Sequence, residues 1–169
     1  MYLATLKINL FMKNTEHAFH WIVDILERHG ITYRISGGLA ARAYGVNREL
    51  ADIDIEIADA DIPNIVDDVK PYIIFGPARY NDEHWDLELM TLNYEDQEID
   101  IAGIKAKIFN SETKQWEPCS DNLESIEIKE VFGRKVPIES MDSLIAYKTK
   151  VGREVDLEDI EQLKNNLLL

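Results

Sequence analysis

The sequence lacks long apolar runs and holds a single cysteine among its 169 residues. Cys119 cannot form a disulfide within the chain, which is typical of a reducing compartment, and we interpret it as a small apolar residue rather than a nucleophile. Apolar runs such as residues 72–75 are far shorter than the roughly 20 residues of a membrane-spanning helix. The first residues lack the basic start and cleavage site of a signal peptide, so we expect a strand over residues 2–11. These absences predict a cytoplasmic protein without a membrane partner.

Basic residues are also scarce, because 18 Lys and Arg stand against 32 Asp and Glu, for a net charge of −14. A nucleic-acid polymer is bound mainly through clustered Lys and Arg, so this balance weighs against such a partner. A single nucleotide remains compatible, since a cation and a few local basic groups can hold a triphosphate. With 46% apolar residues, the chain is long enough to bury one core, and we expect one domain over residues 1–169.

Apolar periodicity and turn residues predict an α+β fold, or an α/β fold with a mixed sheet flanked by helices. Strands dominate the middle of the chain and helices its C-terminal end, with a hairpin around Gly133-Arg134. We expect the sheet region over about 15–110, and the hairpin and C-terminal helices over about 120–169. The expected helices are 15–29, 39–45, 62–70, 140–150 and 156–167, with Asn14 or Thr15, Ser140 and Asp156 as caps. The expected strands are 31–36, 52–58, 85–92, 97–102, 104–109 and the two arms of 125–138.

The strand expected at 52–58, DIDIEIA, alternates strictly between acidic and apolar residues. Asp52, Asp54 and Glu56 therefore share one face, and alternate residues lie about 6.5–7 Å apart along a strand. Burying several carboxylates without a cation is costly, and some of them would protonate instead. The pattern predicts a divalent metal at Asp52 and Asp54, whereas we interpret Glu56 as a solvated residue or an outer partner of the site.

A second acidic strand, QEIDIA at 97–102, places Glu98 and Asp100 on one face. If this strand pairs beside 52–58, Asp100 joins the two aspartates there and completes three hard oxygen ligands. Mg²⁺ prefers such ligands, with Mn²⁺ as a substitute, and two ions would activate an acceptor hydroxyl and stabilise a leaving pyrophosphate. Asp100 is then the natural group to take the proton of the acceptor. Glu98, like Glu56, is interpreted as solvated or as an outer partner.

The Gly37-Gly38 pair lies between an expected strand and a short helix. Glycine allows the backbone to approach a phosphate closely, and a helix that starts there points unpaired N–H groups at an anion. Ser36 adds a hydroxyl donor. We therefore expect these three residues at the phosphates of a nucleotide.

Residues 35–57, ISGGLAARAYGVNRELADIDIEI, resemble the signature of the nucleotidyltransferase-fold superfamily: an apolar residue, Gly, Gly or Ser, about a dozen residues, then Asp-apolar-Asp-apolar. The segment EIDIAG at 98–103 resembles the third-carboxylate strand of the same superfamily. Residues 141–163, MDSLIAYKTKVGREVDLEDIEQL, resemble the helical segment of its small bacterial and archaeal members. Members of similar size include aminoglycoside- and lincosamide-type antibiotic nucleotidyltransferases and the minimal nucleotidyltransferases of toxin–antitoxin systems.

The resemblance implies transfer of a nucleoside monophosphate from an NTP to an acceptor hydroxyl, with release of pyrophosphate. Two departures concern the substrate. Thirteen residues separate Gly38 from Asp52, at the long end of the pattern, and the Thr that follows an Arg in many relatives is absent after Arg48. Arg48 is either a phosphate contact or part of a surface salt bridge. The roles that the resemblance implies are metal binding and catalysis by Asp52, Asp54 and Asp100, and nucleotide binding by Ser36, Gly37, Gly38 and Lys148.

Alternatives remain open at this level. The chain is compatible with a non-catalytic nucleotide-binding or toxin–antitoxin-type regulatory protein, whereas its charge weighs against an RNA-end transferase. Arg153, Asp156 and Asp159 are interpreted as a cap and salt-bridge cluster, and the pair of His17 and His20 lacks an evident third metal ligand. The sequence identifies neither the acceptor nor the preferred base, and it leaves a protein partner or a homodimer open.

Overall fold

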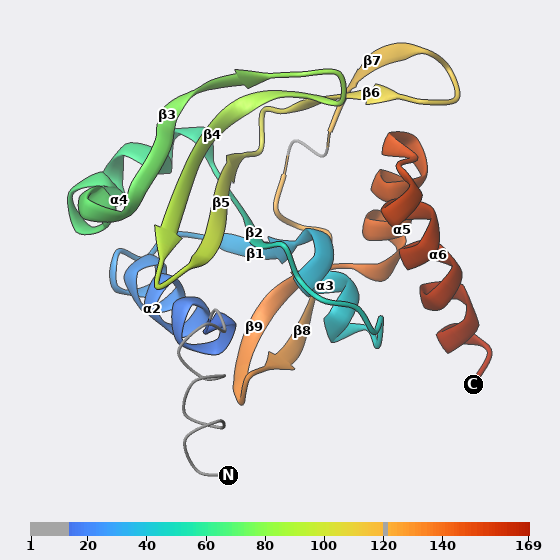
Figure 1. Ribbon diagram of the computed structural model, residues 1–169, viewed down its shortest axis with the longest axis horizontal. Coiled ribbons are helices and arrows are strands. Elements are labelled where there is room, and N and C mark those ends of the chain that lie inside the picture. Colours follow the sequence, from blue (N-terminus) through green and yellow to red (C-terminus); the bar gives the residue numbers. More distant parts are fainter. Residues whose placement is uncertain (1–13, 120–121) are drawn as a thin grey trace, which may run out of the picture.

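The computed structural model describes residues 14–119 and 122–169 (Figure 1). The strand expected over residues 2–11 lies outside this part of the chain. The helices are α2 (Thr15–Arg28), α3 (Gly37–Ala43), α4 (Ile62–Val69), α5 (Met141–Val151) and α6 (Glu154–Leu167). The strands are β1 (Tyr33–Ser36), β2 (Asp52–Ile57), β3 (Ile73–Asn81), β4 (Trp85–Tyr94), β5 (Gln97–Gly103), β6 (Lys107–Asn110), β7 (Gln115–Pro118), β8 (Ile126–Val131) and β9 (Arg134–Glu139).

Across the described residues, nine strands form one mixed sheet in the order β7-β6-β4-β5-β2-β1-β9-β8, with β3 paired to β4. The pairs β2–β5 and β1–β9 are parallel, and the other pairs are antiparallel. Five α-helices accompany the sheet, which confirms the α+β prediction with a helical C-terminal end. No helix in the described part of the chain is long and apolar enough to cross a membrane.

The central strand β2 is buried on one face and open on the other. Ile53, Ile55 and Ile57 are 0% exposed, and they join Phe19 and Leu26 of α2 in one hydrophobic core. Fully burying such a side chain contributes roughly 1.5–3 kcal/mol. A one-residue slip of β2 would put its carboxylates into this core, so the alternation fixes the register and leaves the acidic face free for a site.

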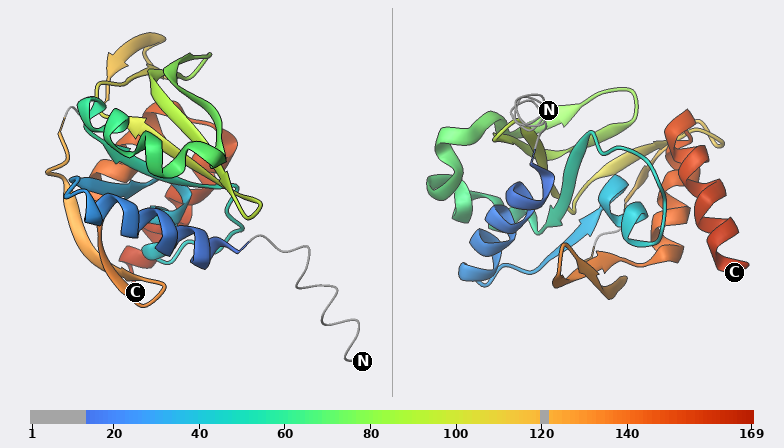
Figure 2. Two further views of the ribbon diagram at one scale, coloured as in Figure 1. Left: turned by 90° about the vertical axis from the view of Figure 1, so that its left-hand side faces the viewer. Right: turned by 60° about the horizontal axis from the view of Figure 1, so that its bottom comes forward.

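The two ends of the molecule carry different helices. Figure 1 and the right-hand view of Figure 2 show α2 and α4 at one end of the sheet and the pair α5–α6 at the other. Helix α3 lies between β2 and α5 and contacts both. Helix α6 meets the C-terminal end of α3, where the side-chain amide of Asn166 donates to the backbone carbonyl of Tyr44 at 3.3 Å.

The helix caps follow the sequence with one exception. The side chain of Asn14 accepts the N–H of His17 at 3.0 Å, and that of Ser140 accepts the N–H of Ser143 at 3.3 Å. The sequence predicted Asp156 as the N-cap of α6, but the N-cap is Arg153. The helix begins earlier, and Asp156 in its first turn accepts the backbone N–H of Arg153 at 3.1 Å.

Two strands were not predicted from the sequence. Most residues of β3 are exposed and its pairing with β4 is interrupted by register shifts, so it lacks the alternation that indicates a strand. Strand β7 has four residues and is held only at the edge of the sheet by β6. Both are strands because a neighbour pairs with them, which local patterning does not reveal.

Candidate functional site

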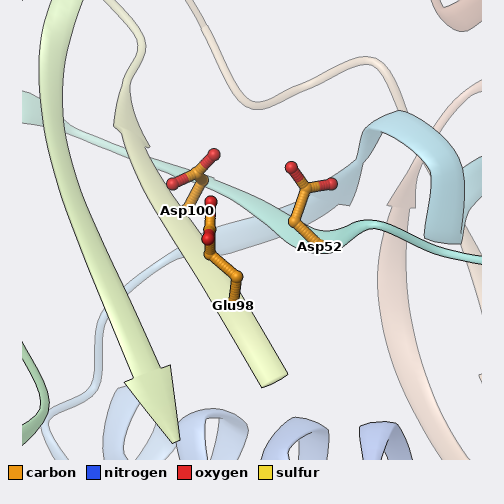
Figure 3. Close-up of side chains that lie close together, drawn as sticks. All are labelled: Asp52, Glu98 and Asp100. Carbon is orange, nitrogen blue, oxygen red and sulfur yellow. The ribbon is translucent and has the colours of Figure 1, made fainter. Parts of the chain in front are cut away.

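Strands β2 and β5 place two pairs of carboxylates side by side. In their parallel pairing, Asp52 lies opposite Glu98 and Asp54 lies opposite Asp100. One carboxylate oxygen each from Asp52, Glu98 and Asp100 lies within 4.8 Å of the other two. Figure 3 shows these three side chains turned toward a common space, one from β2 and two from β5. The expected pairing of the two acidic strands is therefore present.

Asp54 approaches the glycine turn instead. A Cβ atom on Gly37 would lie 2.0 Å from Oδ2 of Asp54, and Gly37 has a φ of +58°. In the pairing of β1 with β2, Asp54 also lies opposite Ser36. The turn expected at the phosphates is thus in direct contact with one of the carboxylates expected at the metal.

Two carboxylates of this site, those of Asp54 and Asp100, have raised pKa values. Burial raises the pKa of Asp54 well above its usual value, and the neighbouring Asp52 and Asp100 raise it further, whereas Lys148 lowers it. Burial also raises the pKa of Asp100 to about 6, although the Thr91 hydroxyl donates a hydrogen bond of 2.6 Å to its Oδ1. A divalent cation would remove this repulsion, and several carboxylate oxygens are the donor set that Mg²⁺ prefers. The residues present therefore fit a magnesium site.

Arg48 lies against the second glycine of the turn. A Cβ atom on Gly38 would be 2.9 Å from Nη2 of Arg48. The guanidinium group donates to both carboxylate oxygens of Asp159, from Nε at 2.7 Å and from Nη2 at 2.9 Å. Arg48 therefore forms a salt bridge, with a buried partner rather than on the surface, and its guanidinium group also lies at the glycine turn.

Lys148 is buried beside the same aspartate. Its side chain is 2% exposed, and its Nζ lies 2.9 Å from Oδ2 of Asp159 and 3.5 Å from Oδ1 of Asp156. Arg153 pairs with Asp156 through Nε at 2.8 Å and Nη2 at 3.0 Å. The salt-bridge cluster expected among the last helices is therefore present, and it also includes two cations that the sequence analysis assigned to the nucleotide.

A cavity of about 430 Å³ is lined by the carboxylates of β2 and β5, the glycine turn and the three cations, whereas Asp156 and Asp159 are not part of its lining. Trp85 and Tyr147 form part of its wall, where the indole N–H donates to the Tyr147 hydroxyl at 2.7 Å. The guanidinium of Arg153 lies 4.8 Å from the centre of the Trp85 ring. The lining includes every residue that the sequence analysis assigned to catalysis, metal or nucleotide: Ser36, Gly37, Gly38, Arg48, Asp52, Asp54, Asp100 and Lys148.

Other residues considered in the sequence analysis have different surroundings in the structure. Glu98, expected to be solvated or an outer partner, is exposed but lies in the carboxylate cluster. Glu56 instead forms an ion pair with the buried Arg34. His17 pairs with Glu95 at 2.6 Å on the surface. Burial raises the pKa of Cys119 to about 12, which disfavours a thiolate nucleophile.

Two features were not predicted from the sequence: the pairing of Asp159 with Arg48 and Lys148, and a buried ionic group around Arg34. Arg34 is 1% exposed and contacts both Glu56 and Glu139, the latter at 3.6 Å. Arg34 lies in β1, Glu56 in β2 and Glu139 in β9, so no local pattern identifies this group. The place of Glu98 in the carboxylate cluster could have been predicted, because Glu98 lies two residues before Asp100 and therefore on the same face of the strand.

No protein-family model matches the sequence, and no curated protein matches it significantly. Solved structures do resemble it. A candidate nucleotidyltransferase from Thermotoga maritima is 21% identical with a TM-score of 0.69, over 91% of this chain and 96% of that one. The lincosamide antibiotic adenylyltransferase LnuA with bound lincomycin is 20% identical with a TM-score of 0.61, over 90% and 98%. ANT(2″)-Ia in complex with adenylyl-2″-tobramycin is 16% identical with a TM-score of 0.61, over 90% and 88%.

These likenesses extend over most of both chains. The chain therefore has the nucleotidyltransferase fold.

Proposed function

We propose that this protein transfers a nucleoside monophosphate from an NTP to an acceptor hydroxyl and releases pyrophosphate. The observation that carries the proposal is the contact between Asp54 and Gly37, which brings a carboxylate of β2 against the glycine turn in the cavity that Asp52 and Asp100 also line. Nucleotidyl transfer needs both parts together, because the metal-binding groups must act on the phosphates that the turn holds.

Each residue has a defined task in this proposal. The phosphates lie along Gly37 and Gly38, where the absence of side chains lets the backbone approach, and Arg48 and Lys148 supply positive charge. Asp52, Asp54 and Asp100 would hold Mg²⁺, which neutralises charge on the triphosphate and on the leaving pyrophosphate. The acceptor hydroxyl loses its proton to a carboxylate oxygen of Asp100 as its own oxygen bonds to the α-phosphorus.

The acceptor is proposed to be a small hydroxylated molecule. A volume of about 430 Å³ lies within the range of small-molecule sites. Trp85 and Tyr147 in the lining offer aromatic surface to a compact acceptor. Two structures with the same fold contain lincomycin and adenylyl-2″-tobramycin, which makes hydroxylated antibiotics the first acceptors to test.

The test combines binding and turnover. Calorimetry with each of the four NTPs, with and without Mg²⁺, should show metal-dependent binding to the wild type and none to Asp52→Asn/Asp54→Asn. The preferred NTP is then incubated with a panel of hydroxylated acceptors, and mass spectrometry should find one acceptor heavier by a nucleoside monophosphate less water.

Asp24→Asn is the matched control, because Asp24 is an exposed aspartate that pairs with Arg134 on the surface at 2.6 Å. It should bind and react like the wild type. Metal-dependent NTP binding without transfer to any acceptor would favour a regulatory nucleotide-binding protein. Absence of NTP binding in the wild type would refute the proposed function.

A further inference from the structure

Asp159 of α6 joins the two cations of the proposed nucleotide site. Its side chain is 0% exposed, and one oxygen, Oδ2, accepts both from Nη2 of Arg48 at 2.9 Å and from Nζ of Lys148 at 2.9 Å. Burial alone would raise the pKa of Asp159, but hydrogen bonds from these two cations hold it below its usual value. Asp159 is therefore a buried, ionised anchor for Arg48 and Lys148.

The anchored guanidinium retains hydrogen-bonding capacity toward the turn. Arg48 uses Nε and one N–H of Nη2 on Asp159, and one N–H of Nη1 on the carbonyl of Glu49 at 3.1 Å. One N–H on each Nη atom remains out of the five donors of an arginine. Both atoms crowd the place of a Cβ on Gly38, at 2.9 and 3.3 Å. The remaining donors are thus held at the turn where phosphates are proposed to lie.

An anchor is needed because the cavity is rich in competing carboxylates. Asp52, Asp54 and Asp100 line it, and Lys148 already interacts electrostatically with Asp54. A free cation in this cavity would pair with the groups that are proposed to hold the metal. Asp159 does not line the cavity and provides a fixed partner outside its lining, so that both cations keep their positions.

We propose that Asp159 is a positioning residue that makes the site selective for nucleoside triphosphates over monophosphates. It holds Arg48 and Lys148 so that their remaining donors face the β- and γ-phosphates, which a monophosphate lacks. This inference rests on the proposed function. It goes beyond it by assigning a role to α6, which supplies none of the metal-binding or turn residues.

The experiment measures two affinities on each variant. The NTP that binds the wild type most tightly in Mg²⁺ and its matching monophosphate are titrated by calorimetry into wild type and Asp159→Asn. Asparagine keeps the size of the side chain but removes the charge that orients both cations. We expect the NTP affinity to fall about tenfold or more, the effect of losing a charge-assisted hydrogen bond, and the monophosphate affinity to change less than about twofold. A merely structural role would weaken both nucleotides alike.

Because Asp159→Asn removes a buried charge, it can fail to fold, and Arg48→Gln provides a second test. It should show the same selective loss of NTP affinity, because it removes the donors that Asp159 is proposed to position. The variant should fold, since the Arg48 side chain is partly exposed, 25% accessible. Arg134→Gln is its matched control, because Arg134 is 24% accessible and also pairs with carboxylates, Asp24 and Glu27, but lies outside the cavity lining. It should keep the wild-type ratio of the two affinities.

The outcomes separate the two proposals. A wild type that binds NTP, with folded Asp159→Asn or Arg48→Gln variants that keep the wild-type ratio, would overturn the role of Asp159 alone. A wild type that binds no NTP in Mg²⁺ would overturn the proposed function and this inference with it. A selective loss of triphosphate affinity supports both.

Discussion

Gly37 and Asp54 are fitted to each other, because any side chain on Gly37 would occupy the space of the Asp54 carboxylate. The distance from an added Cβ to Oδ2 would be 2.0 Å, and the φ of +58° also favours glycine. Gly37 therefore has a structural role besides the phosphate contact that we propose for it. It also lets a carboxylate of β2 reach the start of α3, which brings the two parts of the proposed site into contact.

Gly37→Ala should consequently combine two costs. The left-handed φ alone destabilises a non-glycine residue by on the order of 1 kcal/mol, and the collision with Asp54 adds to it or displaces the carboxylate. We expect a loss of unfolding free energy in urea, and loss of metal-dependent NTP binding. Gly30→Ala isolates the backbone cost, since Gly30 has a φ of +64° and open space around it. Equal stability and equal NTP binding in the two variants would contradict the fit described here.

The contribution of Asp54 to stability should depend on divalent metal: Asp54 should destabilise the metal-free protein and help Mg²⁺ to stabilise it. Burial and the neighbours Asp52 and Asp100 raise the pKa of Asp54, so at neutral pH its ionised form costs stability in the metal-free protein. We expect Asp54→Asn to melt at a higher temperature than wild type in EDTA. Mg²⁺ should then raise the melting temperature of wild type more than that of the variant, because a ligand stabilises the state that binds it. Asp24→Asn, matched in chemistry but on the surface, should respond to Mg²⁺ like wild type. A wild type unaffected by Mg²⁺ would argue against metal at these carboxylates.

The sequence was most informative where the chemistry is local. Strict alternation in DIDIEI and EIDIA predicted the exposed and buried faces of β2 and β5, because a strand has a period of two and one face must be apolar. The sequence did not predict that β2 and β5 pair with each other, which the meeting of Asp100 with Asp52 requires. The structure shows this parallel pairing. The roles assigned to individual residues and the single-domain boundary remain predictions.

Long-range contacts account for what the sequence did not reveal. The bond between Arg48 and Asp159 joins residues 111 positions apart, so the sequence predicted Asp159 in a salt-bridge cluster of the last helices but did not predict Arg48 as its partner. Glu56 and Glu98 occupy equivalent places in the alternating pattern and received the same interpretation. In the structure, Glu56 pairs with Arg34, whereas Glu98 lies beside Asp52 and Asp100. Only the fold distinguishes them.

Glu139 should make stability depend on pH below neutrality. Burial and the nearby Glu56 raise the pKa of Glu139 to about 7, although Arg34, Ser143 and Lys148 favour its ionised form. The folded protein therefore keeps a proton that the unfolded chain releases near its ordinary pKa of 4.5. Stability that is present below pH 4.5 is lost as the pH rises toward 7, and the loss is complete above it.

The check is a comparison of unfolding free energies between pH 4 and pH 8. We expect Glu139→Gln to lack this decline, so that its stability relative to wild type increases across the window by on the order of 1 kcal/mol or more. Glu130→Gln changes an exposed glutamate of the neighbouring strand β8 and should run parallel to wild type. A constant difference between Glu139→Gln and wild type at every pH would contradict the prediction.

Glu98 and Glu56 allow a matched comparison of two substitutions, because both glutamates lie on the acidic face of the paired strands β2 and β5. An oxygen of Glu98 lies within 4.8 Å of oxygens from Asp52 and Asp100, so Glu98→Gln should weaken metal binding, by roughly tenfold for the loss of one anionic neighbour. Glu56 is held by Arg34, so Glu56→Gln should lower the unfolding free energy by leaving a buried cation with one partner fewer, while metal affinity changes little. Mn²⁺ titration followed by electron paramagnetic resonance measures the affinity, and urea unfolding measures the stability. Equal metal affinities in the two variants would place Glu98 outside the metal site and leave its binding to the aspartates alone.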